Sequence, residues 1–320
     1  MNADPRGHAC IIASDLRRTL LTRGAMSFDV HSVFRTSVNL IAEDETFITI
    51  ASSDRDIMPM GLVIEEKPKP ASYIHVDDVV DYGGDMALTI RRTGVTIDLF
   101  NARVWDPALR DHPPTTAAQR RASLAWIRER LRAIKPENGG VAPLIACSDD
   151  SATSSGRAPN MYCSFIGGDL EAFMTALGED DYVKALECSR RLIGFGPGLT
   201  PSCDDFLAGV MLSLYDMYVR TGTRHDTIDR FLRSIAAYAK GATTLVSYHM
   251  LRHAAEGKAS DAYIQLVHAV ATGDVKKLAR VGERALAIGA TSGGDFMYGL
   301  YRAQTMLLDN AVPQDMASSK

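Results

Sequence analysis

Cysteine is scarce in this sequence of 320 residues, and no two of its cysteines are spaced as C-x-x-C. Its five cysteines are odd in number and scattered along the chain. This pattern excludes a disulfide framework and a structural zinc site, and it indicates a reducing compartment. Long apolar runs are also missing, since none approaches the roughly 18–20 residues that a membrane helix needs. Asp4 and Asp15 interrupt the short apolar patch near the N-terminus. We therefore expect no secretory signal and no membrane span, and a cytoplasmic protein.

Neither sign of charge is in large excess. Lysine and arginine total 35 against 39 acidic residues, which gives a net charge of −4, and no dense basic run occurs. This balance argues against a nucleic-acid-binding or membrane-binding surface, so an anionic ligand would need a local pocket. The apolar share of 46% and the charged share of 23% are ordinary for globular proteins and exclude a disordered or collagen-like chain. The length allows about two domains.

The first third of the chain is rich in short β-type runs that turn-forming residues separate. Alternation of polar and apolar residues, clearest from Val95 to Leu99, is typical of a half-buried strand. This spacing predicts a small antiparallel sheet or barrel rather than β-α-β units. The expected strands cover residues 33–40, 46–50, 62–64, 74–76, 86–90 and 95–100.

Helical periodicity dominates the rest of the chain. A helix is expected from Thr115 or Thr116 through Ala133, followed by a mobile loop over 148–160. Further helices are expected over 170–177, 181–193, 204–218, 227–239, 243–256, 261–271, 275–288 and 294–308. We therefore predict an α+β fold, with a small antiparallel β domain over 26–110, a helix and flexible linker over 111–165, a helical domain over 166–309 and a disordered tail over 310–320.

A glycine-rich segment directly precedes the predicted helix at 204–218. It reads Gly196-Pro197-Gly198-Leu199-Thr200-Pro201-Ser202-Cys203-Asp204-Asp205. Alternate glycines let the backbone approach a ligand, and the N–H groups and dipole of a helix start favour an anion. The segment is neither a Walker A loop nor a dinucleotide fingerprint. The alternative is structural, because Ser202 and Asp205 have the spacing of a capping box.

A second segment near the C-terminus repeats this plan. Ser292 and Asp295 are three apart, as Ser202 and Asp205 are, and Asp-Phe-x-x-Gly occurs at both Asp205 and Asp295. We expect both helix starts to converge on one pocket, with chance similarity as the alternative.

Several single residues permit more than one interpretation. Thr243 and Ser247 share a helix face and are candidates for ligand binding, although Thr243 could equally be an N-cap. His249 and His253 have a metal-compatible spacing but no third ligand, so surface histidines are expected. Cys203, which lacks a base partner, is interpreted as a spacer.

The chemistry of the acidic residues also stays open at this point. Asp204, Asp205 and Asp295 could hold Mg²⁺, orient an amide N–H₂ group or cap helices.

Together these motifs resemble the AllH family. The resemblance rests on Gly196-Pro197-Gly198-Leu199-Thr200-Pro201-Ser202-x-Asp204-Asp205, Thr243-Thr244-x-x-Ser247, Leu251-x-x-Ala254-Ala255-x-Gly257 and Gly289-x-Thr291-Ser292-Gly293-x-Asp295. It implies a subunit of oxamate carbamoyltransferase, which converts oxalurate and phosphate into oxamate and carbamoyl phosphate in allantoin breakdown. It also implies FdrA-like and AllG-like partners, and it is compatible with a homo-oligomer. The family usually has histidine where this chain has Ala290.

The resemblance also implies roles for individual residues. Thr200, Asp204, Asp205 and Asp295 would be catalytic, without a certain cofactor, and Mg²⁺ on Asp204 and Asp205 stays an alternative. Phosphate or substrate would be bound by Gly196, Gly198, Leu199, Ser202, Thr243, Thr244, Ser247, Thr291, Ser292 and Gly293. Two other functions stay open. The chain could be a non-catalytic anion-binding subunit, or it could transfer or hydrolyse a carbamoyl or acyl group on another small acid.

Overall fold

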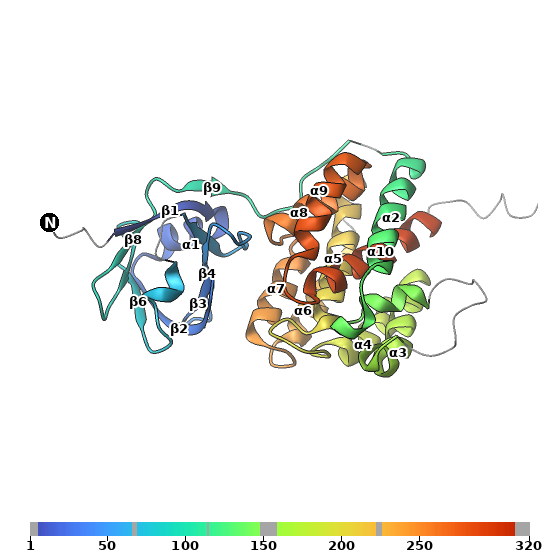
Figure 1. Ribbon diagram of the computed structural model, residues 1–320, viewed down its shortest axis with the longest axis horizontal. Coiled ribbons are helices and arrows are strands. Elements are labelled where there is room, and N and C mark those ends of the chain that lie inside the picture. Colours follow the sequence, from blue (N-terminus) through green and yellow to red (C-terminus); the bar gives the residue numbers. More distant parts are fainter. Residues whose placement is uncertain (1–5, 66–68, 114, 148–158, 222–225, 311–320) are drawn as a thin grey trace, which may run out of the picture. The chain divides into compact units, whose positions relative to one another are not determined.

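The computed structural model describes residues 6–65, 69–113, 115–147, 159–221 and 226–310 (Figure 1). The chain divides into two compact units. The first runs through Ala108 and includes Ala259–Asp261, and the second comprises Leu109–Lys258 and the residues from Ala262 onward. The fold class is α+β, as predicted. No helix of the described residues is long and apolar enough to cross a membrane.

The N-terminal unit is a closed sheet with a short helix, α1 (Ser14–Arg23). Its strands follow the order β5-β4-β3-β2-β6-β7-β8-β1-β9, and an additional pairing of β5 with β1 closes the ring. Inward-facing residues such as Phe28, Leu40 and Ile48 are fully buried and fill the interior. The strands are β1 (Arg6–Ala13), β2 (Met26–Phe34), β3 (Ser37–Ala42), β4 (Phe47–Ser52), β5 (Gly61–Ile64), β6 (Val79–Tyr82), β7 (Ala87–Ile90), β8 (Thr96–Asp98) and β9 (Arg103–Trp105).

Three details of the predicted sheet were wrong. The strand expected over 33–40 contains the turn of the β2–β3 hairpin at Arg35 and Thr36, and the strand expected over 74–76 is a turn that precedes β6. The sheet is not wholly antiparallel, because β1 pairs in parallel with β8 and β9, and β4 with β5. The β1 pairs join strands that are distant in sequence, whereas β4 and β5 are consecutive and pair in parallel across the connection at residues 53–60.

The C-terminal unit is helical, and each expected helix is present, although α3 starts at Met161, nine residues before the helix expected over 170–177. The helix α2 starts with a capping box, in which the Thr116 hydroxyl accepts from Gln119 N and Gln119 Oε1 accepts from Thr116 N. Predicted features over 148–158 and 311–320 lie outside the described residues. The helices are α2 (Ala117–Arg132), α3 (Met161–Gly178), α4 (Tyr182–Leu192), α5 (Ser202–Thr221), α6 (Asp226–Ala239), α7 (Leu245–Ala255), α8 (Asp261–Thr272), α9 (Val275–Leu286) and α10 (Ser292–Asn310).

Helices α5 and α10 cross at the centre of this unit, and glycine is required at the crossing. A Cβ atom on Gly209 would lie 2.2 Å from the carbonyl oxygen of Phe296, and one on Gly299 would lie 2.0 Å from that of Phe206. Only glycine permits such an approach of two backbones. The glycines of the two Asp-Phe-x-x-Gly motifs thus have a packing function, and each lies one turn beyond its aspartate.

Candidate functional site

The glycine-rich loop between α4 and α5 depends on backbone conformations that favour glycine. Gly194, Gly196 and Gly198 have φ values of +81°, +120° and +96°. A Cβ on Gly196 would lie 2.5 Å from the nitrogen of Ser202, so the loop lies directly against the start of α5. Within the described residues, the N–H groups of Gly196, Gly198, Leu199, Thr200 and Ser202 have no hydrogen-bond acceptor, whereas Cys203 N donates to Phe195 O.

A network of polar side chains ties this loop to the start of α7. Asp204 is fully buried and accepts from Gly194 N at 2.8 Å, Thr243 Oγ1 at 2.5 Å and Ser247 Oγ at 2.6 Å. The hydroxyl of Thr244 donates to Leu199 O at 2.5 Å and accepts from Ser247 N at 3.1 Å. The N-cap of α7 is therefore Thr244 and not Thr243. The contacts of Asp204, Thr243 and Ser247 are with one another and with the loop.

The starts of α5 and α10 lie side by side, as the repeated motif predicts. Thr200 Oγ1 and Ser292 Oγ are hydrogen-bonded at 2.9 Å, although the two residues are 92 positions apart. A positive-φ glycine lies against the serine at each start, because a Cβ on Gly289 would be 2.8 Å from Ser292 Oγ, as one on Gly196 would be 3.0 Å from Ser202 Oγ. Two helix N-termini thus meet at one place.

Each of the two aspartates at these starts faces the serine of the other start. Hydrogen bonds from the hydroxyls of Ser292 and Thr200 lower the pKa of Asp205, and those from Ser202 and Thr291 lower the pKa of Asp295. The capping box considered for Ser202 and Asp205 is not formed, because Asp205 N donates to Pro201 O and the Ser202 hydroxyl faces Asp295 instead. The remaining glycine of the motif, Gly293, has a packing reason, since a Cβ there would lie 2.0 Å from the carbonyl oxygen of Ala285.

Asp295 is held from the other side by a segment that was not predicted from the sequence, residues 140–142. Asp295 Oδ1 accepts from the N–H groups of Val141 at 2.7 Å and Ala142 at 2.8 Å. A Cβ on Gly140, whose φ is +77°, would lie 2.7 Å from both carboxyl oxygens of Asp295. The Gly139-Gly140 pair was the available signal, since consecutive glycines often mark a close backbone approach.

Burial dominates the electrostatics of the three aspartates. It raises the pKa of Asp204, which the three donors to its carboxylate oppose. It raises the pKa of Asp205 well above the usual value, and the neighbouring Asp295 carboxylate raises it further. Burial also raises the pKa of Asp295 to about 6, against the N–H groups and hydroxyls that face it. One oxygen of Asp205 and one of Asp295, both Oδ2, are buried without a hydrogen-bond partner among the described residues.

The three aspartates do not form a metal-binding cluster. The described residues contain no group of three or more histidine, cysteine or acidic side chains that could hold a metal ion. Both oxygens of Asp204 already accept N–H or O–H donors, and Asp295 Oδ1 accepts two more. One oxygen each on Asp205 and Asp295 is unpaired among the described residues, so the aspartates offer Mg²⁺ at most two oxygens, and water or phosphate would supply its other ligands.

His249, His253 and Cys203 are all buried. The expectation that His249 and His253 are surface residues was wrong, because both are buried on α7. Burial lowers the pKa of His253 to about 3, so its imidazole is neutral. Burial raises the pKa of the Cys203 thiol well above its usual value, which leaves it un-ionised and agrees with its interpretation as a spacer.

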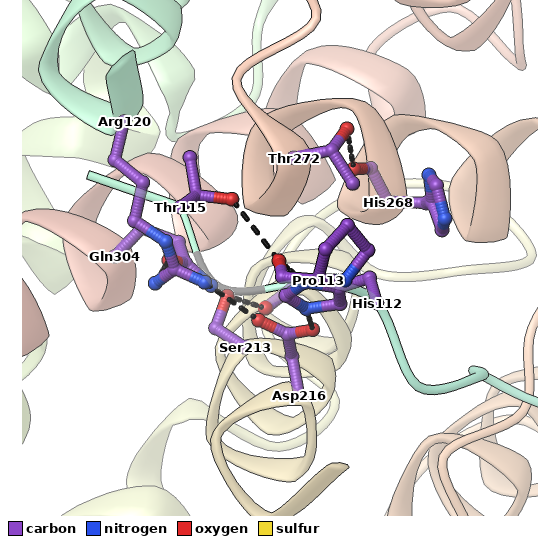
Figure 2. Close-up of polar contacts among 10 residues, drawn as sticks. His112, Pro113, Thr115, Arg120, Ser213, Asp216, His268, Thr272 and Gln304 are labelled. Atoms are coloured by element: carbon purple, nitrogen blue, oxygen red, sulfur yellow. Dashed lines mark hydrogen bonds and ion pairs between the residues drawn. The ribbon is translucent and has the colours of Figure 1, made fainter. Parts of the chain in front are cut away.

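A second buried polar cluster, which the sequence analysis also missed, lies further along α5 (Figure 2). Asp216 accepts from His112 Nε2 at 2.8 Å and from Arg120 Nη2 at 3.2 Å, and Arg120 Nη1 donates to Gln304 Oε1 at 2.9 Å. The other ring nitrogen of His112 lies 3.2 Å from the carbonyl oxygen of Pro113. Because both nitrogens face acceptors, the ring carries two protons and a positive charge.

The physical cause of that charge is the carboxylate. The hydrogen bond to Asp216 raises the pKa of His112, against burial. Asp216 lies on the face of α5 opposite Leu207, Met211 and Leu214, so apolar periodicity gave no signal that it is buried. The cluster ties the segment before α2 to α2, α5 and α10, which gives it a structural role.

Two family models match the chain, one in the β-rich N-terminal unit and one in the helical unit that carries the glycine-rich motifs. Residues 192–304 match the family model described as oxamate carbamoyltransferase subunit AllH, and residues 8–104 match that of the AllH family N-terminal domain. Together the two models cover most of the chain. The converging helix starts lie inside the first match. No solved structure matches the chain.

Proposed function

Because the chain belongs to the AllH family, we propose that it is a subunit of an oxamate carbamoyltransferase-like enzyme. The proposed reaction converts oxalurate and phosphate into oxamate and carbamoyl phosphate, as a step of allantoin degradation in the cytoplasm. The family description names a subunit, which makes partner chains plausible, and we propose FdrA-like and AllG-like proteins as those partners. One observation carries the proposal, namely the meeting of two helix N-termini beneath a glycine-rich loop.

Phosphate is the ligand that this arrangement suits best. Five N–H groups of the loop, on Gly196, Gly198, Leu199, Thr200 and Ser202, have no acceptor within the described residues. The positive ends of two helix dipoles add to them, because α5 and α10 start at the same place. Hydroxyls of Thr200 and Ser292 lie between the two starts. We propose that these groups bind phosphate and stabilise the negative charge that develops at the carbamoyl carbon.

The polar residues around the glycine-rich loop have two proposed roles, which are to hold the loop backbone and to bind the N–H₂ group of the substrate. We propose that Asp204, Thr243, Thr244 and Ser247 act as positioning residues, because their hydrogen bonds hold the backbone of the loop. Gly293 keeps α10 close to α9. The unpaired oxygens of Asp205 and Asp295 are acceptors suited to the N–H₂ group of a carbamoyl substrate, and Thr291 adjoins Asp295.

A second candidate function follows from Ala290, which is exposed just before α10. The histidine usual in the family could donate a hydrogen bond or a proton to substrate, and a methyl group cannot. This difference favours carbamoyl or acyl transfer to, or hydrolysis of, a small acid other than oxalurate. A non-catalytic role, in which the chain binds an anion and positions its partners, is the third candidate.

The test is phosphate-dependent cleavage of oxalurate, followed as formation of carbamoyl phosphate. We would assay the purified chain alone and then with FdrA-like and AllG-like subunits, using Thr200→Val and the exposed Thr22→Val as a matched control. Loss of one transition-state donor typically lowers the rate by about 10²–10³, and we expect that loss for Thr200→Val only. More than a tenth of wild-type activity in Thr200→Val would remove Thr200 from the site. Activity on a different acid in a substrate panel would favour the second candidate.

A further inference from the structure

Asp205 and Asp295 form an acidic pair that a simple anion site would not contain. Their side chains are 1% and 0% exposed, and each has one oxygen, Oδ2, with no hydrogen-bond partner among the described residues. An unpaired buried carboxylate oxygen is costly. These two oxygens therefore need a proton, a water molecule or a ligand.

The crossing of α5 and α10 fixes the two aspartates near each other. Asp205 and Asp295 each precede by four residues the glycine at which the helices touch, so each shares a helix face with that contact. The hydrogen bond between Thr200 Oγ1 and Ser292 Oγ joins the same first turns. Accordingly, the Asp295 charge is the strongest influence on Asp205 after burial.

No cation is among the described residues that act most strongly on the pair. On α5, Asp204 and the un-ionised thiol of Cys203 adjoin it, and α3 contributes the thiol of Cys163, whose pKa burial raises to about 11. The segment at residues 141–142 contributes only backbone N–H groups. Two buried carboxylates without a cation cannot both stay ionised at low cost. One proton on the pair would remove one of the two buried charges and lower this cost.

This pair adjoins the N–H groups of the loop, where a negative ligand would be repelled by ionised carboxylates. We propose that Asp205 and Asp295 share a proton, and that binding of a phosphate-like anion at the glycine loop is accompanied by further proton uptake at this pair. The inference rests on the proposed function, since it assumes that the loop binds an anion. In this arrangement a proton taken up by Asp205 and Asp295 offsets the negative charge of the anion, a role that a lysine or arginine side chain would otherwise have.

The test is calorimetric titration of the full-length protein with inorganic sulfate, a phosphate-like dianion that does not itself titrate between pH 6 and 9. Titrations in two buffers of different ionisation enthalpy give the number of protons taken up. We expect net uptake on binding, and an affinity that weakens by up to about tenfold per pH unit as pH rises. Inorganic phosphate, measured in parallel, should compete for the same site.

Two conservative variants assign the uptake to the pair. In Asp205→Asn and Asp295→Asn, whose folding is checked by circular dichroism, proton uptake should fall to near zero and the pH dependence of affinity should flatten. The exposed Glu179→Gln is the matched control and should behave as wild type. Uptake that persists in both variants would overturn the assignment.

The remaining outcomes separate this inference from the proposed function. Sulfate binding with equal heats in both buffers and no pH dependence would overturn the proton linkage and leave the anion site standing. That comparison uses the wild-type protein, so it decides the question even if a variant does not fold. No binding of sulfate or phosphate at any pH would overturn the anion site, and the linkage with it.

Discussion

Replacing Gly209 with alanine tests the central crossing on which the candidate site depends. The added Cβ would lie 2.2 Å from Phe296 O and 2.7 Å from Leu300 N. Both are backbone atoms within a helix, so no side-chain rotation relieves the overlap, and α5 and α10 must separate. Separation would also displace Asp205 and Asp295, which lie one turn away.

The sign of the effect follows from two opposing magnitudes. Alanine in place of glycine within a helix gains about 1 kcal/mol of helix propensity. Overpacking a close-packed interior typically costs about 1–3 kcal/mol and occasionally more. Contacts this short between backbone atoms belong at the upper end, so we expect a net loss of about 2 kcal/mol. For a domain of 150–250 residues this corresponds to a decrease in Tm of roughly 4–8 °C.

A matched control lies on α3, where a Cβ on the exposed Gly168 would meet no atom within 4 Å. Gly168→Ala should therefore stabilise the protein by up to about 1 kcal/mol through propensity alone. The assay is urea unfolding followed by circular dichroism at 222 nm, which reports on the helical unit. A Gly209→Ala protein as stable as wild type would refute the close crossing. Destabilisation by Gly168→Ala would refute the assumption that alanine gains helix propensity over glycine in these helices.

Three further predictions concern single side chains. Asp204→Asn should lower both activity and Tm, because an amide N–H₂ would face at least one of the three donors that now meet the carboxylate; an unchanged Tm would contradict its positioning role. His112 has a raised folded-state pKa, so its contribution to the free energy of unfolding should be complete below about pH 6.5 and be lost as pH rises through the folded value. Urea unfolding of His112→Gln and wild type across pH should thus show a difference that shrinks toward alkaline pH, and a constant difference would show that the ring is uncharged. Ala290→His should raise the rate on oxalurate relative to other acids in the substrate panel, and no change would remove residue 290 from substrate selection.

Local sequence signals determined much of this protein. The helices were predictable from periodicity and from start signals, as with Thr116 and Gln119 at α2, because capping and amphipathic burial act within a few residues. The β-rich N-terminal unit followed from short alternating runs between turn formers. The glycine motifs were equally informative, since positive φ at Gly196 and Gly198 is a local backbone requirement.

Tertiary structure decided what depends on residues far apart in the chain. It placed β1 inside the sheet, where it pairs in parallel with β8 and β9, and it buried His249 and His253, which were expected at the surface. It set Asp205 against the start of α10, and it joined His112 to Asp216 across 104 residues. Burial and charge pairing arise only when distant elements pack together, so no local pattern of residue types contains them. The sequence therefore located both halves of the candidate site, and their meeting is a consequence of two glycines that let α5 and α10 touch.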